Sequence, residues 1–245
     1  MKKTVSIFLL IAMLAGLFSV ALPTEAEAAS VRNRKIVSVV YDDSGSMSGE
    51  KWEYTSYAMQ CFAAMLNKED RLDITFMSTY NYGSFSVDTG KRAESVKKIR
   101  DHKDSGGTPV QAVNTAFKTL NSVNDNNPNS QYWLIVMTDG QMSGAEKTVN
   151  NIAEKTMPNG TKPRIVYLTL CDVGNQFTPT FNKSNIENRS AKTADEIISV
   201  ISEIACDISG RYPVDPGDIK QVNDATVEVT SDLDRNHKEI CTYDK

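Results

Sequence analysis

The spacing of hydrophobic residues divides the chain into short strands that alternate with longer helices. Apolar, β-branched runs predict buried strands at 36–41 and 132–137, and 164–170 is expected to form a further strand. Apolar residues at helical spacing predict helices at about 50–67, 92–100, 108–121, 143–156 and 193–208. The segment 71–77 alternates like a further strand, and 84–87 is expected to pair with it as a hairpin.

Strands that alternate with helices favour a mostly parallel sheet covered by helices on both faces. We therefore expect an α/β, doubly wound, Rossmann-like fold, in which the hairpin adds one antiparallel edge strand. Two of the predicted helices begin with a hydroxyl residue followed three positions later by a glutamate. These pairs, Ser143 with Glu146 and Thr193 with Glu196, are typical of capping boxes.

Residues 1–28 differ from the rest of the chain. Two lysines precede an apolar stretch at about 5–22, and Ala26-Glu27-Ala28 places small residues where a signal peptidase reads them. The alternative is an uncleaved membrane anchor, because the apolar stretch approaches the length that spans a bilayer. Pro23 favours cleavage, so we expect a secreted or cell-surface protein that meets a membrane only through this segment or through a missing anchor.

The α/β domain is expected to span residues 33–208, and the composition changes beyond Gly210. A linker that contains proline and glycine follows, and 226–230 alternates like one strand. Because a single strand is not a stable domain, residues 209–245 are expected to be a linker and the start of an incomplete C-terminal β module.

The formal net charge of −4 lacks the basic excess typical of nucleic-acid-binding proteins, so no nucleic-acid partner is expected. Export permits disulfides between the cysteines, which are Cys61, Cys171, Cys206 and Cys241. Cys61 and Cys206 lie on predicted helices that could be neighbours, so they are the preferred pair. Buried free thiols are the alternative, above all for Cys61 and Cys171.

Oxygen-bearing side chains follow two of the buried strands and precede one helix. Asp42, Ser44 and Ser46 come after the first strand, Thr108 stands before a helix, and Asp139 follows the strand 132–137. Loops at the carboxyl ends of parallel strands converge, so these side chains are expected to meet at one edge of the sheet. Each segment alone is also explained by turn or capping chemistry, but that explanation would have to hold three times at the same edge.

The spacing of Asp42, Ser44 and Ser46 turns alternate side chains toward one point. With Thr108 and Asp139, the set offers two carboxylates and three hydroxyls, and water can complete the shell. Such an all-oxygen site suits Mg²⁺ or Mn²⁺, and Ca²⁺ less well. The intervening Asp43 is expected to support its neighbours or to face solvent.

The motifs Asp42-x-Ser44-x-Ser46, Thr108 after Gly-Gly, and Asp139 in Thr-Asp-Gly resemble the metal-ion-dependent adhesion site of von Willebrand factor type A domains. The resemblance covers about residues 33–208, and every ligand position of the family is filled. It implies that an acidic side chain of a binding partner completes the metal's shell. It also implies that the helix 193–208 shifts when the site is occupied.

Other candidate chemistry is less specific. Ser48 with Lys51 and Ser95 with Lys98 imitate the serine–lysine pair of penicillin-binding enzymes, but the supporting motifs of those enzymes are absent. His102 and His237 lie in charged segments and are expected to be solvated, which leaves no histidine base.

The loop 78–90 carries Tyr80, Tyr82 and Phe85 among small polar residues. These aromatic residues could form a recognition surface, since interfaces are enriched in exposed tyrosines. The preferred interpretation is a hairpin tip folded onto its own sheet.

We therefore expect a non-enzymatic, metal-dependent protein-binding domain of an exported or cell-surface protein, in which Mg²⁺ bridges to an Asp or Glu carboxylate of the partner. One alternative is a metal-assisted hydrolase, which would need a general base or a second metal that the sequence does not show. Another is a structural subunit of a surface assembly.

Overall fold

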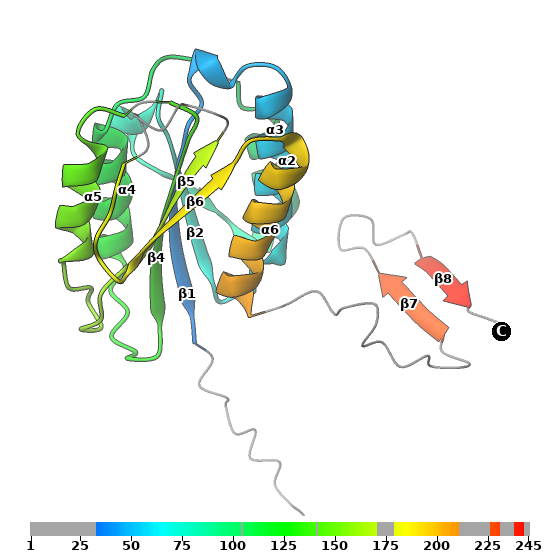
Figure 1. Cartoon of the computed structure of the whole chain (residues 1–245). Helices are drawn as coiled ribbons and strands as arrows, with labels where there is room; N and C mark the ends of the chain where they lie inside the picture. Colours follow the sequence, from blue (N-terminus) through cyan, green and yellow to red (C-terminus); the bar gives the residue numbers. More distant parts are fainter. Residues whose placement is uncertain are drawn as a thin grey trace, which may run out of the picture. The chain divides into compact units, whose positions relative to one another are not determined.

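A six-stranded sheet forms the centre of the domain in the computed structural model (Figure 1). The structure describes residues 33–103, 105–140, 142–170 and 179–210, and the strand segments 226–230 and 238–242. In chain order the strands of the sheet are β1 (Lys35–Tyr41), β2 (Arg71–Phe76), β3 (Phe85–Val87), β4 (Gln131–Thr138), β5 (Arg164–Leu170) and β6 (Ile186–Ala191).

The order of the strands across the sheet is β3-β2-β1-β4-β5-β6. β1 lies parallel to both β2 and β4, and β4, β5 and β6 continue the parallel arrangement. β3 pairs antiparallel with β2 and forms one edge. The predicted α/β fold with a mostly parallel sheet and one antiparallel edge strand is therefore confirmed.

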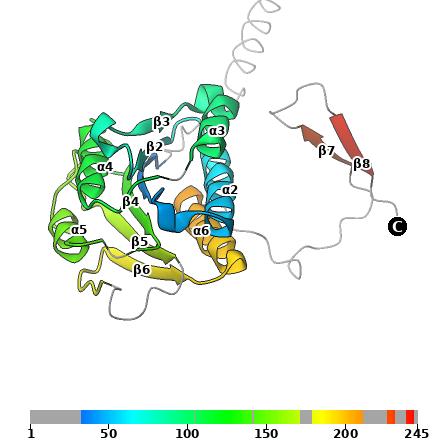
Figure 2. The same ribbon diagram turned by 90° about the horizontal axis from the view of Figure 1, so that it is seen from above.

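Helices cover both faces of the sheet (Figure 2). Their bounds are α2 (Glu50–Met65), α3 (Arg92–Asp101), α4 (Gln111–Ser122), α5 (Ala145–Ala153) and α6 (Ala194–Ser209). The short 3₁₀ turns are η1 (Gly45–Met47), η2 (Tyr80–Tyr82) and η3 (Thr89–Lys91). α2, α3 and α6 lie on one face, and α4 and α5 lie on the other.

The alternation of β1 divides the hydrophobic core between these two faces. Val37 and Val39 pack with residues of α2 and α6, whereas Ile36 and Val40 pack with residues of α4 and α5. All four side chains are fully buried, which explains why β1 is apolar at nearly every position rather than at every second one. The central position of β1 fixes the place from which the following loop, 42–49, leaves the sheet.

The helix termini match the prediction in part. Thr193 caps α6, accepting a hydrogen bond from the Glu196 amide at 3.3 Å as predicted. The predicted capping box at Ser143 is wrong, because the N-cap of α5 is Gly144, which has a left-handed conformation and no side-chain cap. α4 begins at Gln111, three residues after the predicted start at Thr108.

Two strands were not predicted. β6 forms the second edge of the main sheet, and β8 (Lys238–Thr242) pairs antiparallel with β7 (Thr226–Thr230). The predicted strand 226–230 is therefore part of a hairpin. The predicted signal peptide, residues 1–28, and the linker after Gly210 lie outside the described residues. Within the described part of the chain, no helix is long and apolar enough to cross a membrane.

The preferred disulfide is wrong. Cys61 on α2 and Cys206 on α6 are both free thiols, although the two helices do share one hydrophobic core as expected. Cys206 is buried and behaves as a small apolar residue. Cys171 and the side chain of Cys241 lie outside the described residues.

Candidate metal centre

Four of the five candidate metal ligands, Asp42, Ser44, Ser46 and Asp139, follow the carboxyl ends of β1 and β4, the two central strands of the sheet. Tyr41, the last residue of β1, lies beside Met137 of β4, and the amide of Asp42 donates to the Met137 carbonyl at 3.1 Å. The strand order reverses between β1 and β4, since β2 and β3 lie on one side and β5 and β6 on the other. This switch point is where open α/β sheets bind ligands.

Asp42 lies at the floor of the site and is fully buried. One carboxylate oxygen accepts from the Ser44 amide at 2.9 Å, and the other accepts from the Thr138 hydroxyl at 2.6 Å and the Asp139 amide at 3.3 Å. Burial raises the pKa of Asp42, and the hydrogen bonds from Ser44 and Thr138 act in the opposite direction. Asp42 is thus a buried carboxylate in a fixed orientation, and a cation beside it would offset the cost of its charge.

Ser44, Ser46 and Asp139 form a continuous chain of contacts. The hydroxyls of Ser44 and Ser46 lie 2.9 Å apart, and Ser46 donates to Asp139 Oδ1 at 2.8 Å. The 3₁₀ turn η1 brings the two serines side by side, and it is anchored by Met47, which is fully buried in the core. Residues far apart in sequence therefore meet through their side-chain oxygens.

Thr108 completes the set from a third segment. It is half-buried, and its Cγ2 lies 3.5 Å from the position that a Cβ on Gly140 would occupy, next to Asp139. The loop before Thr108 is joined to the first loop, because the Gly45 amide donates to the Gly106 carbonyl at 3.3 Å. The structure thus brings all of the predicted site residues to one edge of the sheet.

The backbone conformation of Gly106 favours glycine over a larger residue. Its φ of +81° lies in the left-handed region, which disfavours side chains. A Cβ at this position would also lie 3.4 Å from the Cβ of Ser78. Gly106 therefore permits the left-handed turn in the loop that leads to Thr108.

Asp43 and His102 hold the loop after β1 in place. The prediction that His102 is solvated is therefore wrong. His102 Nε2 lies 2.7 Å from the Asp43 carboxylate, and the imidazole stacks on Phe76 with ring centroids 3.6 Å apart. Asp43 is fully buried and also accepts from the Ser78 amide at 2.8 Å and the Ser78 hydroxyl. His237 lies outside the described residues.

Lys51 also contacts the candidate metal centre, which the sequence did not lead us to predict. Its ammonium donates to Asp139 Oδ2 at 2.8 Å and to the Ser46 carbonyl at 3.0 Å. The position of Lys51 in the sequence does offer a hint of this contact. Lys51 is the second residue of a predicted helix, where a cation opposes the helix dipole, so another interaction is needed to account for it.

The chemistry of this donor set fits a hard divalent cation. It consists of two carboxylates and three hydroxyls, without histidine or thiolate, and oxygen ligands of this kind suit Mg²⁺ or Mn²⁺. Across the described ranges, no group of three or more His, Cys, Asp or Glu side chains is arranged to hold a metal. An ion at this edge would therefore depend on the hydroxyls as well as on the carboxylates.

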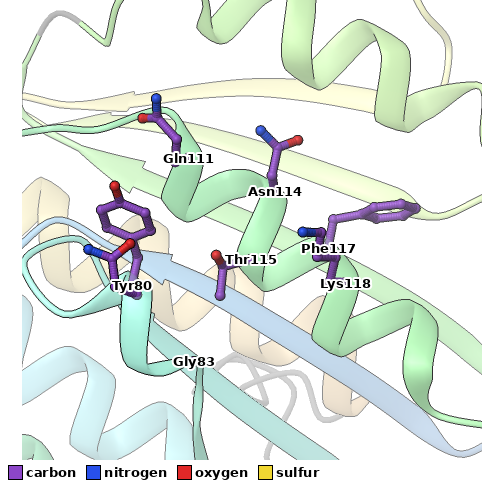
Figure 3. A pocket seen from close by; sticks show the side chains of 8 residues that line it. Tyr80, Gly83, Gln111, Asn114, Thr115, Phe117 and Lys118 are labelled. Atoms are coloured by element: carbon purple, nitrogen blue, oxygen red, sulfur yellow. The ribbon is translucent and has the colours of Figure 1, made fainter.

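A groove lies between η2 and α4 (Figure 3). It has a volume of about 680 Å³. Its lining includes Tyr80 from the hairpin and Gln111, Asn114 and Lys118 from α4. Tyr80 packs partly against the core, as the hairpin-tip interpretation expects, but Tyr82 is 93% exposed and does not fold onto the sheet.

Comparisons with known proteins agree with this architecture. A von Willebrand factor type A protein from Catenulispora acidiphila superposes with a TM-score of 0.52 at 12% identity, covering 80% of this chain and 45% of that chain. The VWA domain of SpRpn10 gives a TM-score of 0.50 at 12% identity, covering 74% of this chain and 99% of that chain. Similarities at this level of identity show the fold alone, and this chain spans less than half of the Catenulispora protein. No curated protein matches the chain in sequence.

The family model of the von Willebrand factor type A domain matches residues 37–166. This match covers more than half of the 245 residues and includes most of β1, the loop after it, Thr108 and Asp139. The chain therefore belongs to the von Willebrand factor type A domain family.

Proposed function

We propose that this chain is a protein-binding domain whose binding depends on a divalent metal held by Asp42, Ser44, Ser46, Thr108 and Asp139. The observation that supports this function is the meeting of these side chains at the switch point of the sheet. Ser46 and Asp139, from loops far apart in sequence, are joined by a hydrogen bond of 2.8 Å. Membership of the family supports an interaction domain rather than an enzyme.

The proposed ion is Mg²⁺ or Mn²⁺. The serine and threonine hydroxyls would contribute neutral oxygens, and Asp42 would contribute a charge whose position is fixed by Thr138 and Ser44. When bound, the metal supplies a positive centre that attracts a negatively charged oxygen ligand. Asp139 would contribute charge, through water in at least one state.

The proposed partner is a protein that presents an Asp or Glu carboxylate. Such a group supplies the hard anionic oxygen that an incompletely filled Mg²⁺ shell prefers. A signal peptide at residues 1–28 would place the domain outside the cytoplasm, secreted or on the cell surface, where it would meet such partners.

The first test replaces Asp42 by asparagine and measures Mn²⁺ binding by calorimetry. Asn keeps the shape of the side chain but removes the charge, so Mn²⁺ affinity should fall by more than about 100-fold while the circular dichroism spectrum stays native. Asp42→Ala should abolish metal binding as well, at a greater cost in stability, because three hydrogen-bond donors lose their acceptor.

Asp70 offers a matched control. It is also a buried aspartate that accepts backbone hydrogen bonds, from the Lys35 and Asn67 amides at 2.9 Å each, but it lies at the opposite end of the strands. Asp70→Asn should leave Mn²⁺ affinity unchanged. Equal affinities for the wild type and Asp42→Asn would contradict the proposed site.

The binding function is tested by capture of partners from the protein's surroundings in Mg²⁺ and in chelator. Partners retained in Mg²⁺ and released by chelator are expected. Association that is indifferent to chelator would instead favour a structural subunit. Metal-dependent turnover of phosphate esters or peptides by the wild type, lost in Asp42→Asn, would favour a hydrolase.

A further inference from the structure

Lys51 places a positive charge directly against the candidate metal centre. Its ammonium lies 2.8 Å from Asp139 Oδ2, and 38% of its side chain is exposed, whereas the Asp139 side chain is 1% exposed. The same carboxylate accepts from Ser46 through its other oxygen. Asp139 is thus shared between a hydroxyl from the metal centre and an ammonium that also reaches solvent.

The position of Lys51 on α2 is not explained by the stability of the helix. The first turn of α2 also holds Glu50 and Glu53, which suit the positive end of the helix dipole, whereas a lysine there opposes it. The stem of Lys51 turns back toward η1, where its ammonium also donates to the Ser46 carbonyl at 3.0 Å. Its contacts are therefore made with the loop of the candidate metal centre.

The charges at this edge of the sheet determine what Lys51 does to a bound metal and to an anion. Asp42 and Asp139 together carry two negative charges, which a divalent ion would balance, and Lys51 adds one positive charge. With the ion in place, three positive charges would face the two carboxylates of the ligand set, while the neighbouring Asp43 carboxylate is held by the Ser78 amide and by His102. A positive centre at a partly exposed edge attracts an anion, and a second cation there opposes the metal itself.

We propose that Lys51 is the second cation of a carboxylate-binding site, in which one oxygen of a partner carboxylate meets the metal and the other meets the Lys51 ammonium. This inference rests on the proposed function and deepens it. Lys51 also neutralises Asp139, which keeps the metal a strong attractor of the incoming anion. The same lysine therefore weakens metal binding and strengthens carboxylate binding.

These two effects have opposite signs, which a merely structural lysine would not produce. The test measures Mn²⁺ affinity by calorimetry, and then the affinity of the Mn²⁺-loaded protein for acetate through water-proton relaxation. Lys51→Met, which keeps the apolar stem and removes the charge, should bind Mn²⁺ about tenfold more tightly and acetate about tenfold more weakly. Lys51→Arg should stay near the wild type in both measurements.

Lys118 is the matched control for net charge. It lies on α4 and lines the groove between η2 and α4 (Figure 3), whereas the Asp139 carboxylate is contacted by Ser46 and Lys51. Lys118→Met should leave both affinities unchanged, and thermal unfolding in chelator shows whether each variant is folded.

The outcomes separate this inference from the proposed function. A wild type that binds no Mn²⁺ would overturn both. A wild type that binds Mn²⁺, together with a Lys51→Met variant whose two affinities are unchanged or change in the same direction, would overturn the role of Lys51 alone. Mn²⁺ binding without any acetate binding would likewise leave the metal site and remove the carboxylate site.

Discussion

Thr138 donates a hydrogen bond of 2.6 Å to the fully buried Asp42 carboxylate, although it is not itself a candidate ligand. Thr138→Val keeps the shape of the side chain and removes this donor. A buried charge that loses a hydrogen bond costs about 1–3 kcal/mol, so the free energy of unfolding measured with urea in chelator should fall by that amount. Mn²⁺ affinity should fall as well, because the orientation of Asp42 is less well fixed.

Thr75 provides the comparison for this variant. It is also fully buried, but its hydroxyl lies 2.6 Å from the neutral hydroxyl of Ser84 rather than from a carboxylate. Thr75→Val should therefore cost less stability and leave Mn²⁺ affinity unchanged. Equal losses of metal affinity in the two variants would show that Thr138 acts only through general stability.

The candidate ligands could be predicted from the sequence because each follows a strand or precedes a helix that the hydrophobic pattern predicts. The residues that hold them could not. His102 reaches Asp43 across 59 positions, and its environment depends on the ring of Phe76 and on the loop that leaves α3. Nothing in a charged segment distinguishes a solvated histidine from one that is drawn inward by a buried carboxylate.

At the scale of elements, β6 shows where a hydrophobic pattern fails. Its sequence is IENRSA, and only Ala191 is buried, so the strand lacks both an apolar run and regular alternation. Backbone pairing with β5 forms it instead, as expected of an edge strand with charged side chains. The start of α4 differs from the prediction for another reason. Pro109 fits the first turn of a helix, but here it belongs to the turn before α4.

Arg189 links β6 to α6 and yields a prediction about both elements. Its guanidinium contacts Glu187 at 2.7 Å, and Glu203 and Asp207 of α6 at 3.0 Å each. The acidic partners are partly exposed, so each pair contributes little, and Arg189→Met should lower the free energy of unfolding by only about 1 kcal/mol. Hydrogen exchange of α6 should nevertheless become faster, because the helix loses its ionic contacts with the sheet edge.

Arg100 is a suitable control, since its ion pair is with the adjacent Asp101 and joins no two elements. Arg100→Met should leave the exchange of α6 unchanged. The shift of α6 on occupation of the site remains a prediction from the family resemblance. If it is correct, Mn²⁺ should change the exchange of α6 in the wild type, and Arg189→Met should alter the size of that change.

At the scale of the whole molecule, the switch point of the sheet holds several polar side chains in a buried region, where apolar side chains would stabilise the fold more. Asp42, Asp43, Ser44 and Asp139 are all buried at the ends of β1 and β4, and burial raises the pKa of Asp42. Such an arrangement lowers the stability of the domain, since buried charge is costly unless it is compensated. A ligand that binds the folded state and supplies positive charge beside Asp42 would raise that stability.

This reasoning predicts a large, specific stabilisation by metal. A ligand that binds only the folded state adds about 2.7 kcal/mol at 100 times its dissociation constant, which in a domain of this size raises Tm by about 5–10 °C. Calorimetric scans of the protein in Mn²⁺ should show this increase, and excess chelator should reverse it. Asp42→Asn should lose the increase and Asp70→Asn should retain it, because only the first removes a charge at the switch point. An identical increase in both variants would mean that Mn²⁺ stabilises the protein elsewhere, and the five side chains at the carboxyl ends of β1 and β4 would then need another explanation.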